Sequence, residues 1–334
     1  MTTPYVIGIG NAVMDVIAPT SDATLARLGV EKGIMQLIDR ERSEFLMAAQ
    51  SADPQAGKAR LVPGGSVANT LAGLGMMGLR TAFIGKVAGD PLGLSYAEQT
   101  EAQGTVFVNP PVAGEVAPTS RSIIFVTPDG ERSMNTYLGI SGELGPEDVN
   151  PTTFSGCDWL FLEGYLFDED AGKAAFLKAA EACHAAGGQA GIALSDPFCV
   201  DRHRDDFRKL VSETMDYVIG NAHEWESLYQ TNLDEALRLA TADCHTVICT
   251  RSGDPAILIR GNQRIEVPVH RVTPVDATGA GDQFAAGLIF GLASGVDLET
   301  AGRMAVMAAS EVISHVGARP ERSLLADFEA AGLI

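Results

Sequence analysis

The segment VDATGAGDQF, residues 275–284, indicates most about the fold of this chain. Its turn of small residues leads directly into an apolar stretch that continues to Ala293 and favours a helix. Glycine lets the backbone take unusual dihedral angles and lets a ligand approach closely. Amides at a helix N-terminus point outward, where they can bind an anion. The segment therefore predicts an anion-binding turn made by Gly279, Ala280 and Gly281, with Asp282 facing the same pocket.

Asp282 has two interpretations at this position. A single aspartate in the first turn of a helix usually only complements the helix dipole. Here a second aspartate, Asp276, comes before the same Gly-Ala-Gly turn. Two carboxylates around an anion-binding turn favour a functional role for Asp282 over a purely structural one.

Outward from this segment, short apolar runs alternate with stretches that favour helices. The helical stretches include Ser66–Gly78, Gly172–Ala186 and Asn232–Ala242. This alternation is typical of βαβ units. We therefore expect an α/β fold with a doubly wound, mostly parallel sheet flanked by helices. The runs expected to form its strands are Tyr5–Ile9, Thr81–Gly85, Trp159–Glu163, Gln189–Leu194, Tyr217–Gly220 and Thr246–Thr250.

Two regions interrupt the alternation and have no helix of their own. Gly33–Ile38 is a short β-like run. Further along, Thr105–Val108, Arg121–Val126 and Arg132–Tyr137 resemble a β-meander with a turn at Thr127–Gly130. We expect residues 16–39 and 105–137 to form a small β lid. The large domain would then comprise residues 1–15, 40–104 and 138–334.

Three further polar patterns are candidate sites, each with a structural alternative. Pro63–Asn69, PGGSVAN, brings Gly64 and Gly65 to a helix start with Asn69 one turn inside, although Ser66 could simply cap that helix. Asn221 and Glu224 could order a metal-bound water or a phosphate, or only cap a helix. Asn11 and Asp15 could bind sugar hydroxyls or satisfy a turn.

Several common motifs are absent. No P-loop occurs, Val13 breaks the dinucleotide-binding pattern, and the six histidines lack metal-ligand spacing.

Composition excludes several classes of protein. The 334 residues are 46% hydrophobic and 20% charged, as in a folded globular protein. A net charge of −19 repels phosphate backbones and anionic lipids, so we expect no nucleic acid and no membrane as partner. Five scattered cysteines without a Cys-x-x-Cys pattern favour reduced thiols and a cytoplasmic location. The sequence leaves open whether the protein is a monomer or a homodimer.

Taken in order, these motifs resemble those of the ribokinase family of carbohydrate kinases, also called the phosphofructokinase-B type. The resemblance extends from Gly8 to about Ala318, and its most specific part is the Asp-x-Thr-Gly-Ala-Gly-Asp motif that ends at Asp282. It implies a doubly wound sheet with a β lid, and transfer of the γ-phosphate of ATP to a hydroxyl group.

The resemblance also implies roles for individual residues. Asp282 would be the general base, and Gly279, Ala280 and Gly281 would form the anion hole. Asn11, Asp15, Gly64, Gly65, Asn69 and Asn135 would bind the acceptor. Asn221, Thr250, Arg251, Gly253, Thr278 and Ala309 would bind the nucleotide. Glu224 would hold Mg²⁺ through water, and Asp276 with Gly317 would hold a monovalent cation, K⁺.

Within the family, the chain looks most like the bacterial adenosine kinase-like branch. The stretches that carry this resemblance are Gly130–Gly139, which contains Asn135, then Glu163–Tyr165 and Asp196–Arg202. Ala277 departs from the threonine common in the family. The resemblance of the three stretches nevertheless implies adenosine as the acceptor.

Two alternatives remain. A kinase for ribose, fructose or a keto-deoxy sugar acid would share the chemistry, and a sugar acid would need a basic residue such as Arg132. A non-catalytic nucleoside- or sugar-binding regulator would need no base, so the intact Asp282 argues against it.

Overall fold

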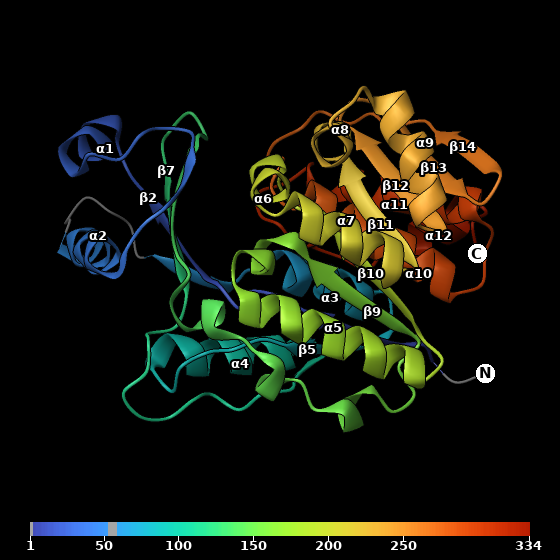
Figure 1. Ribbon diagram of the computed structural model, residues 1–334. Helices are drawn as coiled ribbons and strands as arrows, with labels where there is room; N and C mark the ends of the chain where they lie inside the picture. Colours follow the sequence, from blue (N-terminus) through green and yellow to red (C-terminus); the bar gives the residue numbers. More distant parts are fainter. Residues whose placement is uncertain (1–2, 53–58) are drawn as a thin grey trace.

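The computed structural model describes residues 3–52 and 59–334; the parts of the expected domains at 1–2 and 53–58 lie outside the described residues. A nine-stranded sheet forms the centre of the large domain, in the order β14-β13-β12-β11-β10-β9-β1-β5-β6 (Figure 1). Its strands from β6 to β12 are parallel, whereas β13 and β14 are antiparallel. Their bounds are β1 Tyr5–Ile9, β5 Arg80–Ile84, β6 Thr105–Phe107, β9 Trp159–Glu163, β10 Gln189–Ala193, β11 Tyr217–Asn221, β12 Thr246–Arg251, β13 Asp254–Arg260 and β14 Gln263–Val267.

Helices cover both faces of this sheet and bury two separate hydrophobic cores. This arrangement confirms the expected doubly wound α/β fold. One face carries α5 Asp170–Ala185, α6 Pro197–Arg202, α7 Arg204–Glu213, α8 Ala222–Tyr229 and α9 Leu233–Asp243. The other carries α3 Ser66–Met76, α4 Pro91–Ala102, α10 Ala280–Ala293, α11 Leu298–Val312 and α12 Leu325–Ala330. Short 3₁₀ helices lie at η1 Gly139–Glu143, η2 Pro146–Asp148, η3 Pro151–Phe154 and η4 Gly164–Asp168.

A second, smaller sheet stands apart from the first in the order β3-β8-β7-β2-β4 (Figure 1). Its strands are β2 Met14–Pro19, β3 Met35–Leu37, β4 Arg60–Pro63, β7 Arg121–Val126 and β8 Arg132–Tyr137. The expected runs Gly33–Ile38, Arg121–Val126 and Arg132–Tyr137 all contribute to it. The edge strand β4 was not expected, because it is short and only one of its residues is fully buried.

The expectation for Thr105–Val108 was wrong, because β6 belongs to the large sheet. It pairs in parallel with β5 after the crossover helix α4. The buried hydroxyl oxygens of Thr81 and Thr105 form a hydrogen bond of 2.8 Å. The Phe107 ring packs against Phe83 and Tyr96. The β5-α4-β6 unit and these contacts together place β6 at the edge of the large sheet.

The expectation that the small sheet has no helix was also wrong. Two helices, α1 Asp22–Leu28 and α2 Arg40–Ala52, lie beside it (Figure 1). Their side chains Leu25, Leu28 and Leu46 form a buried cluster with Ile123 and Phe125 of β7. Residues 40–52 therefore pack with the small sheet and not, as expected, with the large domain.

Candidate active site

A cavity of about 780 Å³ lies where the small sheet faces the carboxyl ends of the large-sheet strands. Parallel α/β sheets bind ligands at this edge, because the loops after neighbouring strands converge there. Asn11 follows β1, Glu163 ends β9 and Asn221 ends β11, and all three line the cavity. The small sheet contributes Asp15 and Met134 from the opposite side.

Asp282 sits in the first turn of α10 and lines this cavity. Its Oδ1 accepts a hydrogen bond of 2.6 Å from the Ser66 hydroxyl, and its Oδ2 accepts one of 2.9 Å from Asn69 Nδ2. Burial raises the pKa of Asp282, while the two hydrogen bonds and the nearby charge of Arg319 oppose that rise. The structure thus brings Asn69 and Asp282 together and leaves a half-buried, oriented carboxylate beside the cavity.

The turn before Asp282 has the expected geometry for close approach. Gly279 has φ +82°, and a Cβ there would lie 2.5 Å from the Ala318 carbonyl oxygen, so only glycine fits. Gly281 has open space on its Cβ side and lines the cavity, as do Thr278 and Gly279. The amide of Ala280 instead donates to the Ala277 carbonyl at 3.3 Å. In this turn, Gly279 and Gly281 are therefore the residues whose backbone a ligand in the cavity could approach.

The Gly64-Gly65 pair brings the backbone close to Asp15 and Asn11. A Cβ on Gly64 would lie 2.6 Å from Asp15 Oδ2, and a Cβ on Gly65, which has φ +97°, would collide with the Asn11 carbonyl. Burial raises the pKa of Asp15 to about 7, against the opposing charges of Arg319 and Arg132. A carboxylate held in this way favours a ligand with hydroxyl donors.

Glu163 is a site residue that the sequence reasoning did not single out. It is buried, lines the cavity, and its Oε1 accepts from both the backbone and the side-chain nitrogen of Asn11, at 2.6 and 2.9 Å. Its Oε2 accepts from the Val67 amide at 3.2 Å. Asn11 also accepts from Ser141 at 2.8 Å, so its side chain is held in place. The available signal was an acidic residue ending an apolar strand run.

The structure does not bring Asn135 to the cavity, contrary to expectation. Its side chain is fully buried and bonds Gln36, the Ile123 carbonyl and the Ser133 carbonyl. Side chains alternate along a strand. Its neighbours Met134 and Thr136 therefore face the cavity instead.

On the expected nucleotide side, Asn221, Glu224 and Thr250 line the cavity. Asn221 and Glu224 form a reciprocal helix cap: the Asn221 amide and Nδ2 donate to the Glu224 carboxylate at 2.8 and 2.6 Å. Arg251, Gly253 and Ala309 are not among the lining residues. Arg251 bonds the Pro255 carbonyl at 2.6 Å and Glu266 at 3.2 Å, on the hairpin beyond the cavity.

The side chains that line the cavity can be compared with those that a Mg²⁺ site needs. Within residues 3–52 and 59–334, His, Cys, Asp and Glu side chains do not gather in threes around a possible metal position. Glu224 is nevertheless buried at the cavity wall, and burial raises its pKa to about 7. A nearby cation would favour its charged form. These residues fit a Mg²⁺ held mainly by phosphate oxygens, with Glu224 reaching it through water.

The position expected to hold K⁺ already has a cationic partner. Arg132 Nη1, from β8, lies 2.9 Å from Asp276 Oδ2, and both side chains are about nine-tenths buried. The same Asp276 carboxylate accepts from the Gly317 amide at 2.9 Å and the Thr278 amide at 3.0 Å. The guanidinium therefore neutralises Asp276, and these residues do not fit an additional K⁺ in this arrangement.

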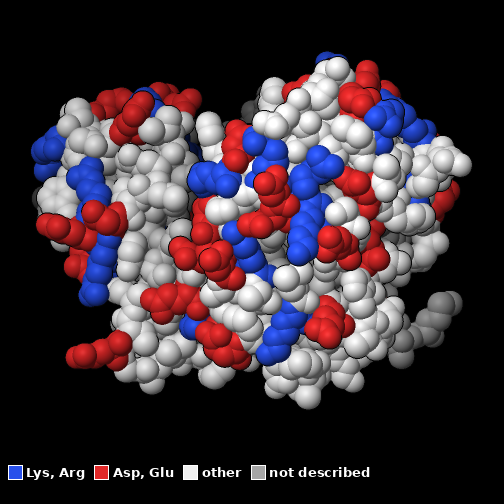
Figure 2. Space-filling view, viewed as in Figure 1, with Lys and Arg blue, Asp and Glu red and all other residues white. Residues whose placement is uncertain are grey.

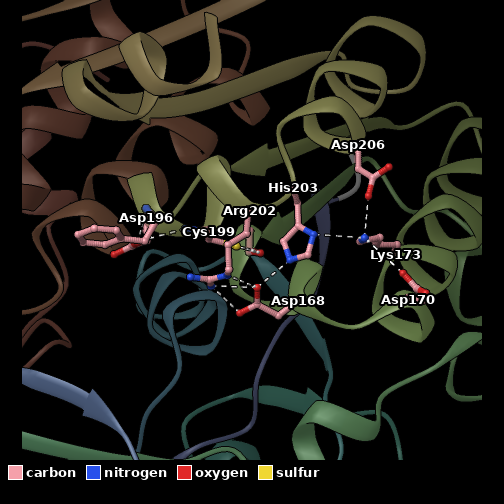
Figure 3. A network of polar contacts seen from close by, with 10 residues as sticks. Asp168, Asp170, Lys173, Asp196, Cys199, Arg202, His203 and Asp206 are labelled. Carbon is pink, nitrogen blue, oxygen red and sulfur yellow. Dashed lines mark hydrogen bonds and ion pairs between the residues drawn. The ribbon is translucent and has the colours of Figure 1, made fainter. Parts of the chain in front are cut away.

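Aromatic, apolar and charged side chains that were not assigned to the site complete the cavity rim. Asp168 accepts from Arg202 Nη2 at 2.8 Å and contacts His203 Nε2 at 2.9 Å, which ties η4 to α6 (Figure 3). The network continues from His203 to Lys173 and Asp206. Tyr165, Asp168, Phe198 and Arg202 all line the cavity.

On the face in Figure 2, the described Lys and Arg side chains are interspersed with Asp and Glu. Among the described residues, no continuous basic patch stands out on this face. None of the described helices is long and apolar enough to cross a bilayer.

Comparisons with known proteins agree with this fold and cavity. The family model described as "pfkB family carbohydrate kinase" matches residues 33–323. A fructokinase from Klebsiella pneumoniae is 31% identical over 257 residues, which is 71% of this chain and 80% of that protein. The matched proteins are phosphotransferases that act on an alcohol group, and this chain is an enzyme of that class.

Two solved structures resemble the chain over almost its whole length. A probable sugar kinase from Rhizobium etli has 41% identity and a TM-score of 0.88, covering 100% of both chains. An adenosine kinase from Sinorhizobium meliloti has 41% identity and a TM-score of 0.87, covering 99% of this chain and 100% of that one. The chain belongs to the pfkB family of carbohydrate kinases, within the ribokinase superfamily.

Proposed function

We propose that this enzyme transfers the γ-phosphate of ATP to the 5′-hydroxyl of adenosine, with Asp282 as general base. The observation that supports adenosine over a simple sugar is a set of exposed apolar side chains around the cavity. Met35, Leu37, Tyr165 and Phe198 all line it, and they are 51%, 58%, 39% and 73% exposed. A purine ring would cover such side chains and remove apolar surface from water, whereas a sugar would leave them uncovered.

The polar end of the cavity suits the ribose. Asp15, beside Gly64 and Gly65, presents a carboxylate that can accept from sugar hydroxyls. Hydrogen bonds to its charged form would offset the cost of its burial. The acceptor would then lie with its base among these apolar side chains and its reacting hydroxyl near Asp282.

In the proposed chemistry, Asp282 accepts the proton of the acceptor hydroxyl as the oxygen attacks the γ-phosphorus in line. Ser66 and Asn69 hold the two carboxylate oxygens and so fix the direction of that proton transfer. Amides of the Gly279–Gly281 turn stabilise the charge on the transferred group. When bound with ATP, Mg²⁺ neutralises phosphate charge, and Glu224 is the residue that would reach it through water.

The small sheet would act as a lid. Arg132, on this sheet, reaches Asp276 and the Thr278 hydroxyl on the loop that begins the anion-binding turn. In the proposed lid, this contact would hold the sheet against the large domain. A closed lid excludes water, which would otherwise compete as phosphate acceptor.

A sugar kinase is the second candidate, because the Klebsiella pneumoniae fructokinase shares 31% identity. A sugar acid fits less well, since Arg132, the basic lid residue expected to meet its carboxylate, is paired with Asp276. The oriented Asp282 carboxylate argues against a non-catalytic regulator, because binding alone requires no base. A cytoplasmic location and a role in purine salvage form part of this proposal.

The test is ADP release from Mg-ATP with adenosine, ribose, fructose and a keto-deoxy sugar acid side by side. We expect turnover with adenosine, and Leu37→Ala and Tyr165→Ala should raise its KM about tenfold each. Leu177→Ala serves as control, because Leu177 is similarly exposed, at 52%, but does not line the cavity. Turnover with a sugar and none with adenosine would refute adenosine as the acceptor, but it would leave the proposed phosphoryl transfer in place.

A further inference from the structure

Arg319 lies behind the catalytic residues and belongs to none of the motifs. It follows α11, and its Nε donates to Asn69 Oδ1 at 3.0 Å. Its Nη1 bonds the side-chain oxygen of Gln103, just after α4. Its Nη2 is buried without a hydrogen-bond partner among the described residues. Ala318 lines the cavity but Arg319 does not, so it reaches the reaction only through other residues.

The contact with Arg319 fixes which way the Asn69 amide points. A guanidinium has only donors, whereas the asparagine amide has one acceptor oxygen and one donor nitrogen. Because Oδ1 faces Arg319, Nδ2 faces Asp282 Oδ2, at 2.9 Å. A flipped amide would set its oxygen against the Asp282 carboxylate and its nitrogen against the guanidinium, and both contacts would be repulsive.

The charge of Arg319 acts on the same carboxylate. Burial raises the pKa of Asp282, and Arg319 counteracts this rise. The acidic groups that couple to Asp282 from neighbouring elements are Asp15 of β2 and Glu163 of β9, and Tyr165 of η4 lies near as well. Arg319 is the cation that lowers the pKa of both Asp15 and Asp282.

We infer that Arg319 is a positioning residue for phosphoryl transfer: it orients the Asn69 amide toward Asp282 and sets a positive charge behind that carboxylate. This inference rests on the proposed role of Asp282 as base, but it does not depend on which acceptor is used. It assigns a function to a buried charge that the motifs leave unexplained.

The first test follows the Asp282 carboxyl without any turnover. In protein labelled with ¹³C at the Asp carboxyl carbons, the signal lost in Asp282→Asn identifies this group, and its titration midpoint is measured by NMR. We expect Arg319→Gln to raise the midpoint by about one pH unit, since an opposite charge nearby lowers a carboxyl pKa by about 1–3 units. Arg319→Lys keeps the charge and should restore most of the wild-type midpoint. An unchanged midpoint in Arg319→Gln would overturn the inference.

The second test uses the pH profile of kcat/KM with the acceptor that supports turnover. Arg319→Gln should move the acidic limb upward by the same amount, about tenfold in rate per unit on that limb, with partial recovery at high pH. In an Asn69→Ala background the same change should cost clearly less, because the residue through which Arg319 acts is gone. Equal, pH-independent losses in both backgrounds would mean a purely structural role.

Two controls separate stability from positioning. Arg322→Gln removes an exposed arginine from the same segment, where it pairs with Asp327, and should leave the pH profile unchanged. Thermal unfolding of each variant shows whether Arg319→Gln remains folded; if it does not, Gln103→Leu removes a partner of the guanidinium and should shift the profile in the same direction. If the Asp282 midpoint shifts in Arg319→Gln but the enzyme does not turn over adenosine, the inference about Arg319 stands and only adenosine as the acceptor is refuted.

Discussion

At the scale of single residues, the proposed chemistry depends most on Asp282. Asp282→Asn keeps the size of the side chain and can still bond Ser66, so we expect a folded protein with an unchanged unfolding temperature. It cannot accept the hydroxyl proton, and general-base catalysis contributes roughly 100- to 10,000-fold. Measured kcat should fall by that range. A variant within a few-fold of the wild-type rate would show that another group is the base.

Asp15 leads to a prediction about pH and stability. Burial raises its folded-state pKa to about 7, above the unfolded value, so the folded protein binds the extra proton between these two values. Stability from this group is therefore lost as pH rises from about 4 to 7. Without ligand, Asp15→Asn should be more stable than wild type at pH 8 by about 4 kcal/mol, since each unit of the pKa rise is worth about 1.4 kcal/mol, and should gain less at pH 5. Urea unfolding at both pH values measures this, and an equal effect at the two would contradict it.

Among single residues, the sequence predicted those with a motif and missed those defined by the fold alone. Asp282, Gly279 and Asn69 were identified because short spacing places them at helix starts. Arg319 could not be found in this way, since its partner Asn69 lies 250 residues away in the chain. Asn135 was misplaced because a motif match does not say toward which face of a strand a side chain points.

At the scale of elements, the N-terminal turn of α10 offers a matched pair of substitutions. Gly279→Ala would force φ +82° on a residue with a Cβ only 2.5 Å from the Ala318 carbonyl oxygen, and should cost about 1–3 kcal/mol of stability as well as activity. Gly281→Ala meets nothing within 4 Å and should keep or raise helix stability. Its methyl group would nevertheless stand in the proposed anion site. We expect normal unfolding but a raised KM for ATP, and an unchanged KM would place the phosphate elsewhere.

The large-sheet elements were predictable because buried parallel strands are continuous apolar runs. The small sheet was predicted only in part. In α2, Ser43 and Leu46 are the buried residues, so its apolar pattern predicts packing on that sheet only weakly. The three residues of β6 were too short to indicate which of the two sheets they join, and the crossover through α4 decided it.

At the scale of the whole molecule, the Arg132–Asp276 pair joins the small sheet to the large domain just before the proposed anion-binding turn. If the sheet works as a lid, this pair favours the closed state. Arg132→Ala should then weaken closure and leave Asp276 without its cationic partner. We expect a raised KM for the acceptor and a larger fraction of ATP lost to water, because an open site admits the competing acceptor.

The measurement is the ratio of ADP formed to phosphorylated acceptor formed, which stays near one for a coupled kinase and rises when hydrolysis competes. Arg40→Ala is the control, because Arg40 lies on α2 beside the same sheet, is exposed and pairs with its helix neighbour Glu44. Loss of rate in Arg132→Ala with a ratio still near one would assign Arg132 to phosphate binding rather than to closure. A raised ratio in Arg132→Ala alone would instead identify the contact between the two sheets as the device that keeps water out of the reaction.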